Sequence, residues 1–221
     1  MDSMKLLDVP LVRQDVDSLD CGIACVSMLL KYYGIEKDIP ALKKDIQVFD
    51  GVGTYVPQLG KFLIDNGFHV EIITLNPHLF VRTDANRSSQ ELGKYFEEIR
   101  DKTTKENFKA PLRYFKEFVE SGGVLALRVP TVEDIRAELN DGRPLGALIT
   151  SNFLLSETSG FNFHFNIVTG IDEQNVYVND SMWDSRGGAQ SYPIHDFMYA
   201  LYASAFGDLD NAALMKVRRK S

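Results

Sequence analysis

Cysteine and histidine are both scarce in this sequence, with two cysteines and four histidines among 221 residues. The two cysteines, Cys21 and Cys25, are one helical turn apart, which is not a zinc-ligand spacing, and His-Glu-x-x-His does not occur. We therefore expect no metal and no other cofactor. So few cysteines also fit a protein of the reducing cytoplasm.

Long apolar runs and an excess of positive charge are missing as well. No stretch of about 18 apolar residues occurs, so we expect no membrane span. Asp8 and Pro10 interrupt any hydrophobic segment at the start of the chain, which argues against a secretory signal and favours a cytoplasmic location. The net charge of −7 argues against a nucleic-acid partner, because basic patches supply most of the affinity for phosphate backbones. The short basic end at 218–220 is expected to be a frayed, solvated terminus.

The hydrophobic periodicity predicts an α+β fold, with helices leading and a sheet trailing. No repeat, low-complexity tract or linker divides the chain, so we expect a single domain over residues 1–221. Besides a helix that begins near Cys21, helices are expected at residues 54–66, twice between 88 and 120, and at 131–140. Strands are expected at residues 10–13, 68–74, 145–151, 163–169, 175–179 and 213–217, most of them forming an antiparallel sheet.

Residues 20–34 predict a turn that delivers a cysteine to the first turn of a buried helix. Asp20 is a good N-cap, the following turns are almost wholly apolar, and Gly34 stands where a left-handed residue would end the helix. Backbone N–H groups at a helix N-terminus favour the thiolate, the form of cysteine that attacks a carbonyl carbon. Cys21 is therefore the candidate nucleophile, whereas Cys25 is expected to be an ordinary core residue.

A predicted hairpin carries the residues that such a thiol needs as partners. His164 opens the first strand, and Asn179 and Asp180 end the second. Pairing would bring the imidazole close to Asn179 or Asp180, and the acceptor would fix its tautomer. Alternation along a strand turns only one of these two residues toward His164. With Asp180, the three residues have the composition of a thiol acyl-transfer triad of nucleophile, base and orienting carboxylate.

The other three histidines have simpler explanations. His69 takes a solvent-side position in an alternating strand, and His78 follows a proline in a loop. His195 is the one serious competitor as the base, but its neighbours are typical of a turn that enters the final helix.

Together these features resemble the bacteriocin-processing cysteine peptidases, papain-like domains that cut after double-glycine leaders. The likeness is carried by Gln14, the run Asp20-Cys21-Gly22-Ile23-Ala24-Cys25, Tyr32-Tyr33-Gly34, His164 and Asp180. It implies a papain-like fold in which the buried cysteine helix packs on an antiparallel sheet. It also implies that Cys21 is the nucleophile, His164 the base, Asp180 the orienting residue and Gln14 a side-chain donor to the oxyanion. Residues 76–123 have no counterpart in that family and are expected to form a helical insertion, or a lid, within the domain.

The sequence departs from the family pattern in two places. Gln14 lies seven residues before Cys21, where the family usually has six, so the loop must absorb an extra residue if the amide is to reach the oxyanion. If it does not, the backbone N–H of Cys21 remains as one donor. Ser181 replaces the usual proline after Asp180, and this leaves Asn179 as a rival orienting residue.

The hypothesis that follows is a cysteine-dependent acyl-transfer enzyme, most simply an amide or peptide bond hydrolase working through a thioester on Cys21. The expected partner is a peptide or small amide substrate, and no pattern in the sequence indicates an oligomeric state. Three alternatives stay open. They are an acyltransferase that uses the same triad with an amine acceptor, a non-catalytic peptide-binding module, and a guanylyl cyclase-like protein that shares the Asp-Cys-Gly-x-Ala-Cys run.

Overall fold

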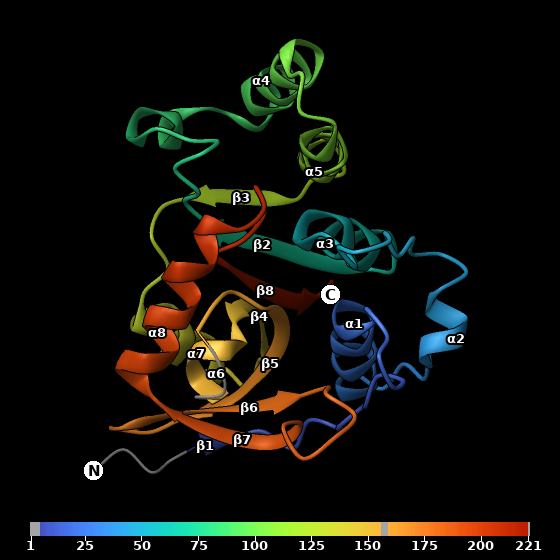
Figure 1. The fold of residues 1–221 in the computed structure, drawn as a ribbon, viewed down its shortest axis with the longest axis vertical. Helices are drawn as coiled ribbons and strands as arrows, with labels where there is room; N and C mark the ends of the chain where they lie inside the picture. The colour runs from blue at the N-terminus through green and yellow to red at the C-terminus, as the bar shows by residue number, and fades with distance from the viewer. Residues whose placement is uncertain (1–4, 156–158, 221) are drawn as a thin grey trace.

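An eight-stranded sheet runs through the whole molecule, and helices cover both of its faces (Figure 1). The structure is a computed structural model that describes residues 5–155 and 159–220. All neighbouring strands are antiparallel except β2 and β3. The strands follow one another across the sheet in the order β3 (Val124–Leu127), β2 (Phe68–Thr74), β8 (Ala213–Arg219), β4 (Leu145–Thr150), β5 (Phe163–Ile171), β6 (Asn175–Asp180) and β7 (Gly188–Pro193), while β1 (Lys5–Leu6) pairs with β5.

The two faces of the sheet bury two separate hydrophobic clusters. Along β4, Leu148 points into the cluster shared with α1 (Cys21–Tyr32) and α3 (Val56–Asp65), whereas Ala147 and Ile149 point into the cluster shared with α6 (Val132–Asn140) and α8 (Ile194–Ala203). This is the period-2 alternation of a strand buried on both faces. The remaining helices are α2 (Ile39–Leu42), α4 (Ser89–Lys102), α5 (Glu106–Glu120), α7 (Ser151–Leu155) and the 3₁₀ turns Arg82–Asn86 and Ser204–Phe206. None of the helices described has the length and apolar character that a bilayer crossing requires.

Helix α1 is built as its sequence suggests. Every residue from Gly22 to Leu30 is buried, as expected of a helix that is apolar on all sides. Gly34 has a φ of +80° and ends the helix in a Schellman motif, in which Ile35 N–H donates to Leu30 O at 2.8 Å and Gly34 N–H to Lys31 O at 2.9 Å. The motif fixes the far end of the helix, and the near end presents Cys21.

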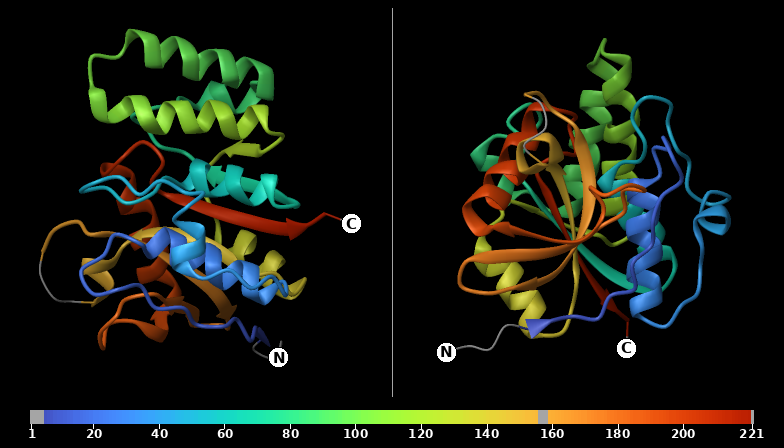
Figure 2. Two further views of the ribbon diagram at one scale, coloured as in Figure 1. Left: turned by 90° about the vertical axis from the view of Figure 1, so that its right-hand side faces the viewer. Right: turned by 60° about the horizontal axis from the view of Figure 1, so that its bottom comes forward.

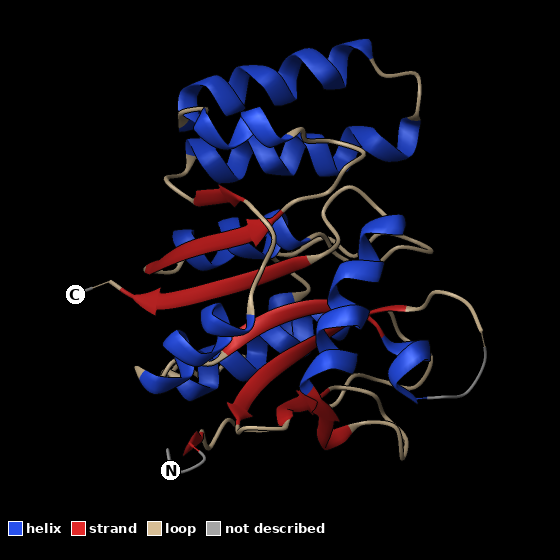
Figure 3. Ribbon diagram, turned by 90° about the vertical axis from the view of Figure 1, so that its left-hand side faces the viewer, coloured by secondary structure: helices blue, strands red, loops and turns tan. Residues whose placement is uncertain are grey.

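Helices α4 and α5 form a layer beyond the β3 edge of the sheet, stacked on α3 (Figures 2 and 3). The aromatic side chains of Phe96, Phe115 and Phe118 are completely buried there. They belong to the same hydrophobic cluster as the residues of α1, so this layer is continuous with the main core.

Most of the expected elements are confirmed, and the differences have physical reasons. The expected strand at residues 10–13 is wrong: this segment has no strand pairing, and the short strand lies earlier, at Lys5–Leu6. Strands β3 and β7 were not predicted, because β3 is a short run of four apolar residues without alternation, and β7, although its positions alternate, has Gly188 and Gln190 rather than apolar residues at two of its inward positions. The expected antiparallel sheet is confirmed, and β3, which was not predicted, adds one parallel pair to it beside β2.

The basic end of the chain is a second correction. It is not a frayed terminus, because β8 extends to Arg219 and pairs along its whole length with β2. Arg218 donates to Glu138 Oε1 at 2.8 Å, and Lys220 N–H donates to Gly67 O at 3.0 Å. Residues 1–4, the start of the segment considered for a secretory signal, lie outside the described residues.

Candidate active site

Cys21 is the first residue of α1 and is partly exposed at its N-terminus. Asp20 precedes it at the N-cap position, but its side chain makes no capping hydrogen bond, which corrects the expected cap. The buried carboxylate instead pairs with Lys43 Nζ at 3.0 Å. Gly22 follows Cys21 where there is no room for a side chain, since a Cβ there would lie 2.1 Å from Thr54 Oγ1. The loop before α3 is therefore packed directly against the start of α1.

The register of the central hairpin brings His164 to Asp180. Asn166 on β5 is directly opposite Asp180 on β6, so His164, two residues earlier on the same face, is its diagonal neighbour. The two side chains meet in a hydrogen bond of 2.8 Å between His164 Nε2 and Asp180 Oδ1, and both are buried. Met182 N–H also donates to Asp180 Oδ1 at 2.8 Å, which holds the carboxylate in place.

Asn179 is turned away from the imidazole. Its Nδ2 donates to Val9 O at 2.7 Å, on the N-terminal segment. Of the two residues that the sequence left as alternatives, Asp180 is the one that contacts His164, because strand alternation separates them.

The protonation states of Cys21 and His164 are coupled. Burial by itself would raise the pKa of the Cys21 thiol, but the hydrogen bond and charge of His164, together with the backbone N–H groups of Phe165 and Gly22, bring it below its ordinary value. Burial would likewise lower the pKa of His164, but its hydrogen bonds to Asp180 and Cys21 raise it to about 10. These opposite shifts favour a thiolate beside an imidazolium. Because Nε2 is bonded to Asp180, Nδ1 is the ring nitrogen left for the sulfur.

Gln14 lies next to the residue that follows Asp180. Its Oε1 accepts a hydrogen bond from Ser181 Oγ at 3.0 Å, and its Nε2 donates to Ser18 O at 2.7 Å. The loop takes up its extra length in a turn at Asp17, whose φ of +56° is left-handed. One of the two hydrogens on Nε2 is used by Ser18, so the amide retains one that it can donate elsewhere.

The other candidate residues lie where the sequence placed them. Cys25 is fully buried in α1, and burial raises the pKa of its thiol well above the ordinary value. His69 is exposed on β2, His78 is exposed in a loop, and His195 is exposed in the first turn of α8.

Cys21 opens into a cleft of about 420 Å³. Its walls come from the loop before α3, the start of β5 and the loop before β8. Sequence analysis missed Thr54, Asp208, Asp210 and Asn211 on these walls, because none belongs to a motif and they meet only in the folded chain. It also missed Arg13, which donates to Met182 O at 2.6 Å and to Asp184 O at 3.0 Å and so secures the loop after Asp180.

Comparison with known proteins gives a consistent result. The model of the Peptidase_C39 like family matches residues 6–206. A crystal structure described as a C39-like peptidase from Bacillus anthracis matches with a TM-score of 0.52 at 16% identity, covering 100% of both chains. A double glycine motif protease from an AMS/PCAT transporter, solved in complex with the leader peptide, matches with a TM-score of 0.50 at 15% identity and covers 97% of this chain and 94% of the other. No curated protein matches this chain.

Proposed function

This chain belongs to the Peptidase_C39 like family and is a papain-like cysteine peptidase, and from that premise we propose that Cys21, His164 and Asp180 are its catalytic triad. The proposal is supported above all by the 2.8 Å hydrogen bond between His164 and Asp180, on the imidazole that also hydrogen-bonds Cys21. In this arrangement the nucleophile, the base and the orienting carboxylate are linked in one chain of hydrogen bonds.

The chemistry follows from the charges of the three groups. The Cys21 thiolate attacks the carbonyl carbon of the scissile bond, and the His164 imidazolium gives its proton to the departing amine, leaving an acyl thioester. His164 then takes a proton from water, whose oxygen attacks the thioester, so that the acid is released and the Cys21 thiolate is restored beside the His164 imidazolium. Asp180 keeps the imidazole oriented and stabilises its charged form.

Donors for the oxyanion lie at the start of α1. The backbone N–H of Cys21 is at the positive end of the helix dipole, where a developing negative charge is stabilised. We assign the remaining Nε2 hydrogen of Gln14 as the second donor. A peptide is the substrate class we propose, and the cytoplasm, whose reducing conditions keep a thiol free, is the compartment we propose.

The test is to trap the acyl-enzyme. Wild-type protein and the Cys21→Ala variant are mixed with a peptide digest of cell extract, quenched in acid and examined by mass spectrometry. Wild type is expected to gain an acyl adduct on the peptide that contains Cys21, and Cys21→Ala to gain none and to release no products. Cys25→Ala is the control and should retain turnover, since Cys25 is sealed in the core.

The same experiment separates hydrolysis from transfer to an amine. In water labelled with ¹⁸O, hydrolysis places the label in the new carboxylate, whereas an acyltransferase forms an unlabelled amide with added glycinamide. An adduct on Cys25 rather than Cys21, or turnover that survives Cys21→Ala, would contradict the proposal.

A further inference from the structure

The cleft that contains Cys21 has an acidic end. Among its described lining residues, the only charged side chains besides the thiol are Asp208 and Asp210, in the loop before β8. Val56 N–H donates to Asp210 Oδ2 at 2.6 Å, and Leu209 N–H donates to Asp208 Oδ1 at 2.8 Å. The first bond fastens the loop to the start of α3, two residues after Thr54, which itself packs against Gly22. The acidic pair is thus tied to the segment that adjoins the thiol.

No cation of the protein neutralises this pair within the described chain. Burial raises the pKa of Asp208, and burial together with the charge of Asp208 raises the pKa of Asp210 to about 7. No lysine or arginine contributes to either shift. The two buried carboxylates of α6, Asp134 and Glu138, by contrast, each have an arginine partner. Two desolvated carboxylates without a counter-ion are destabilised, and a positive charge brought into the cleft would relieve both.

Unpartnered polar atoms lie at the same end of the cleft. Asn211 Nδ2 and Thr54 Oγ1 are buried and have no hydrogen-bond partner in the described structure, and both residues line the cleft. The side chains are 3% and 6% exposed, respectively. A buried polar group left unpaired costs about 1–3 kcal/mol, so such atoms are expected where a ligand supplies the missing partner. The Thr54 hydroxyl faces Gly22, whereas the Asn211 amide lies beside the two carboxylates, where it can bind a peptide carbonyl next to a charged group.

Aromatic rings complete the wall. Burial raises the pKa of Tyr55, and the charges of the nearby Asp208 and Asp210 raise it further. A Cβ on Gly207 would lie 2.3 Å from both the Phe163 ring and Asn211 Nδ2, so these groups crowd around the backbone of Gly207. Aromatic faces attract organic cations, and they do so more strongly where water is excluded.

We infer that this end of the cleft is a subsite for a positively charged group of the substrate, either a lysine or arginine side chain or a free N-terminal ammonium. Asp208 and Asp210 would bind the charge, and Asn211 would bind a neighbouring peptide group. The inference deepens the proposed function and rests on it, because it places the cation in the cleft of the reacting thiol.

The first test needs no substrate. Thiosulfonate reagents of similar size, the cationic 2-aminoethyl and the anionic 2-sulfonatoethyl methanethiosulfonate, are reacted with Cys21 in the Cys25→Ala background, and the two rates are compared. The cationic reagent is expected to react at least about tenfold faster, because the pair of carboxylates attracts it. Asp208→Asn should lower the ratio several-fold, and Asp210→Asn, which retains a carbonyl oxygen for Val56 N–H, should do the same. Asp101→Asn, an exposed carboxylate on α4, removes one unit of overall charge and should leave the ratio unchanged.

The second test identifies the source of the charge. Peptide substrates are compared as matched pairs, lysine with norleucine, arginine with citrulline, and a free amino terminus with an acetylated one. One of these pairs should differ by about tenfold or more in kcat/KM, and the difference should shrink in Asp208→Asn. A preference for the neutral member in all three pairs would overturn the inference, as would a rate ratio that Asp208→Asn and Asp101→Asn change equally.

The two tests separate failure of the subsite from failure of the proposed function. A reagent-rate ratio that depends on Asp208, in a protein that cleaves no peptide, would support the subsite and contradict the proposed peptide substrate. Peptide cleavage without any preference for a charged substrate would support the proposed function and contradict the subsite. If millimolar Ca²⁺ or Mg²⁺ abolishes the ratio at constant ionic strength, the pair binds a divalent cation instead, and the inference fails.

Discussion

Cys21 owes its chemistry to its neighbours more than to its place on a helix. Burial opposes ionisation of the thiol, and the helix N-terminus by itself offers only partial charges. His164 supplies both a hydrogen bond and a full positive charge, and Asp180 keeps that charge on the imidazole. Cys25 lies in the same helix without such a partner, and burial together with the charges of Cys21 and Asp180 raises its pKa.

His164→Ala should therefore reverse the direction of the Cys21 pKa shift. With the imidazole gone, burial remains as the largest influence, and the pKa of the thiol should rise above its ordinary value of 9.0. Iodoacetamide alkylation of Cys21 at pH 7 is expected to slow by about tenfold or more, because the thiolate is the reacting form. Peptide mass spectrometry across pH 5–10 measures the rates. Cys25 serves as an internal control, and an unchanged pH profile for Cys21 would refute the assigned role of His164.

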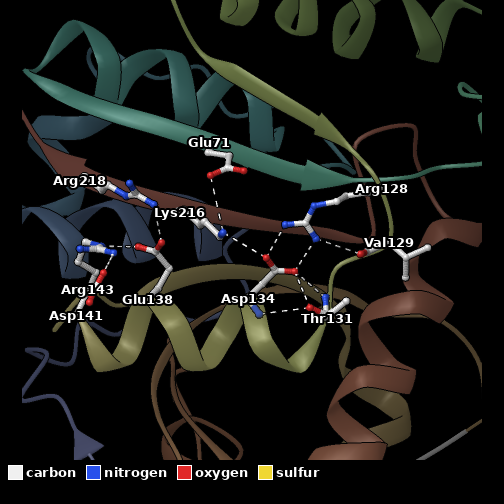
Figure 4. A network of polar contacts seen from close by, with 10 residues as sticks. All are labelled: Glu71, Arg128, Val129, Thr131, Asp134, Glu138, Asp141, Arg143, Lys216 and Arg218. Carbon is white, nitrogen blue, oxygen red and sulfur yellow. Dashed lines mark hydrogen bonds and ion pairs between the residues drawn. The ribbon is translucent and has the colours of Figure 1, made fainter. Parts of the chain in front are cut away.

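Among the elements, α6 is fastened to the sheet by ion pairs as well as by its buried apolar residues Ile135 and Leu139. Asp134 accepts two hydrogen bonds from Arg128, at 2.5 and 2.7 Å (Figure 4). It also accepts one from Lys216 Nζ of β8 at 3.3 Å. One turn later, Glu138 pairs with Arg143 and Arg218. Asp134 also closes a capping box with Thr131, so one carboxylate both starts the helix and anchors it.

Replacing Asp134 with asparagine should destabilise the protein by about 1–3 kcal/mol at pH 7, because buried Lys216 loses its nearer carboxylate and keeps only Glu71, and because the charge-assisted hydrogen bonds from the half-exposed Arg128 are lost. Urea unfolding measures the difference, and Glu133→Gln, an exposed neighbour in the same helical turn, should change stability by less than about 0.5 kcal/mol.

The same substitution makes the effect of pH testable. Arg128 holds the pKa of Asp134 well below its ordinary value of 3.8. A lowered pKa in the folded state stabilises the protein above the ordinary value, and this stabilisation is lost as the pH falls toward the folded-state pKa. The difference between wild type and Asp134→Asn should therefore be constant from pH 6 to 8 and narrow below pH 4. A difference that stayed constant down to pH 2 would show that the charge of Asp134 does not matter.

At the scale of the whole molecule, the question is whether α4 and α5 are a separate lid or part of the domain. The Phe118 ring lies over Gly60 of α3, since a Cβ on Gly60 would be 2.8 Å from it. The start of α5 also reaches the cleft, where Asn107 is a lining residue. These contacts make residues 76–123 a layer of the main core that also borders the cleft, and we propose that it folds with the rest of the chain.

Phe118→Ala should then destabilise the entire domain by about 3–5 kcal/mol. Trp183, the single tryptophan, lies in the loop after β6, so its fluorescence reports on the edge of the sheet opposite β3. Circular dichroism reports on all the helices. Both signals should shift to the same lower urea midpoint. If Trp183 kept the wild-type midpoint while helicity was lost earlier, the layer would be an independently folding lid.

Local pattern was enough to identify much of this protein. The apolar run after Cys21, the capping box at Thr131 and the paired strands that carry His164 and Asp180 are all local signals, because helix caps and strand alternation act over a few residues. The resemblance to the family likewise depended on residues that stand close together in the sequence, with His164 and Asp180 as distant additions.

Other features were decided only by the folded chain. Asp180 rather than Asn179 contacts His164 because the β5–β6 register and the bond to Val9 O set their directions. The side chain of Asp20 pairs with Lys43 rather than capping α1, and the basic C-terminal end is held in β8 by its neighbours. The acidic end of the cleft brings together two loops that are far apart in the sequence, at Thr54 and at Asp210. Sequence periodicity indicates which side of an element is buried. Which distant side chains meet there is decided by tertiary packing, and those neighbours determine the charge of the site.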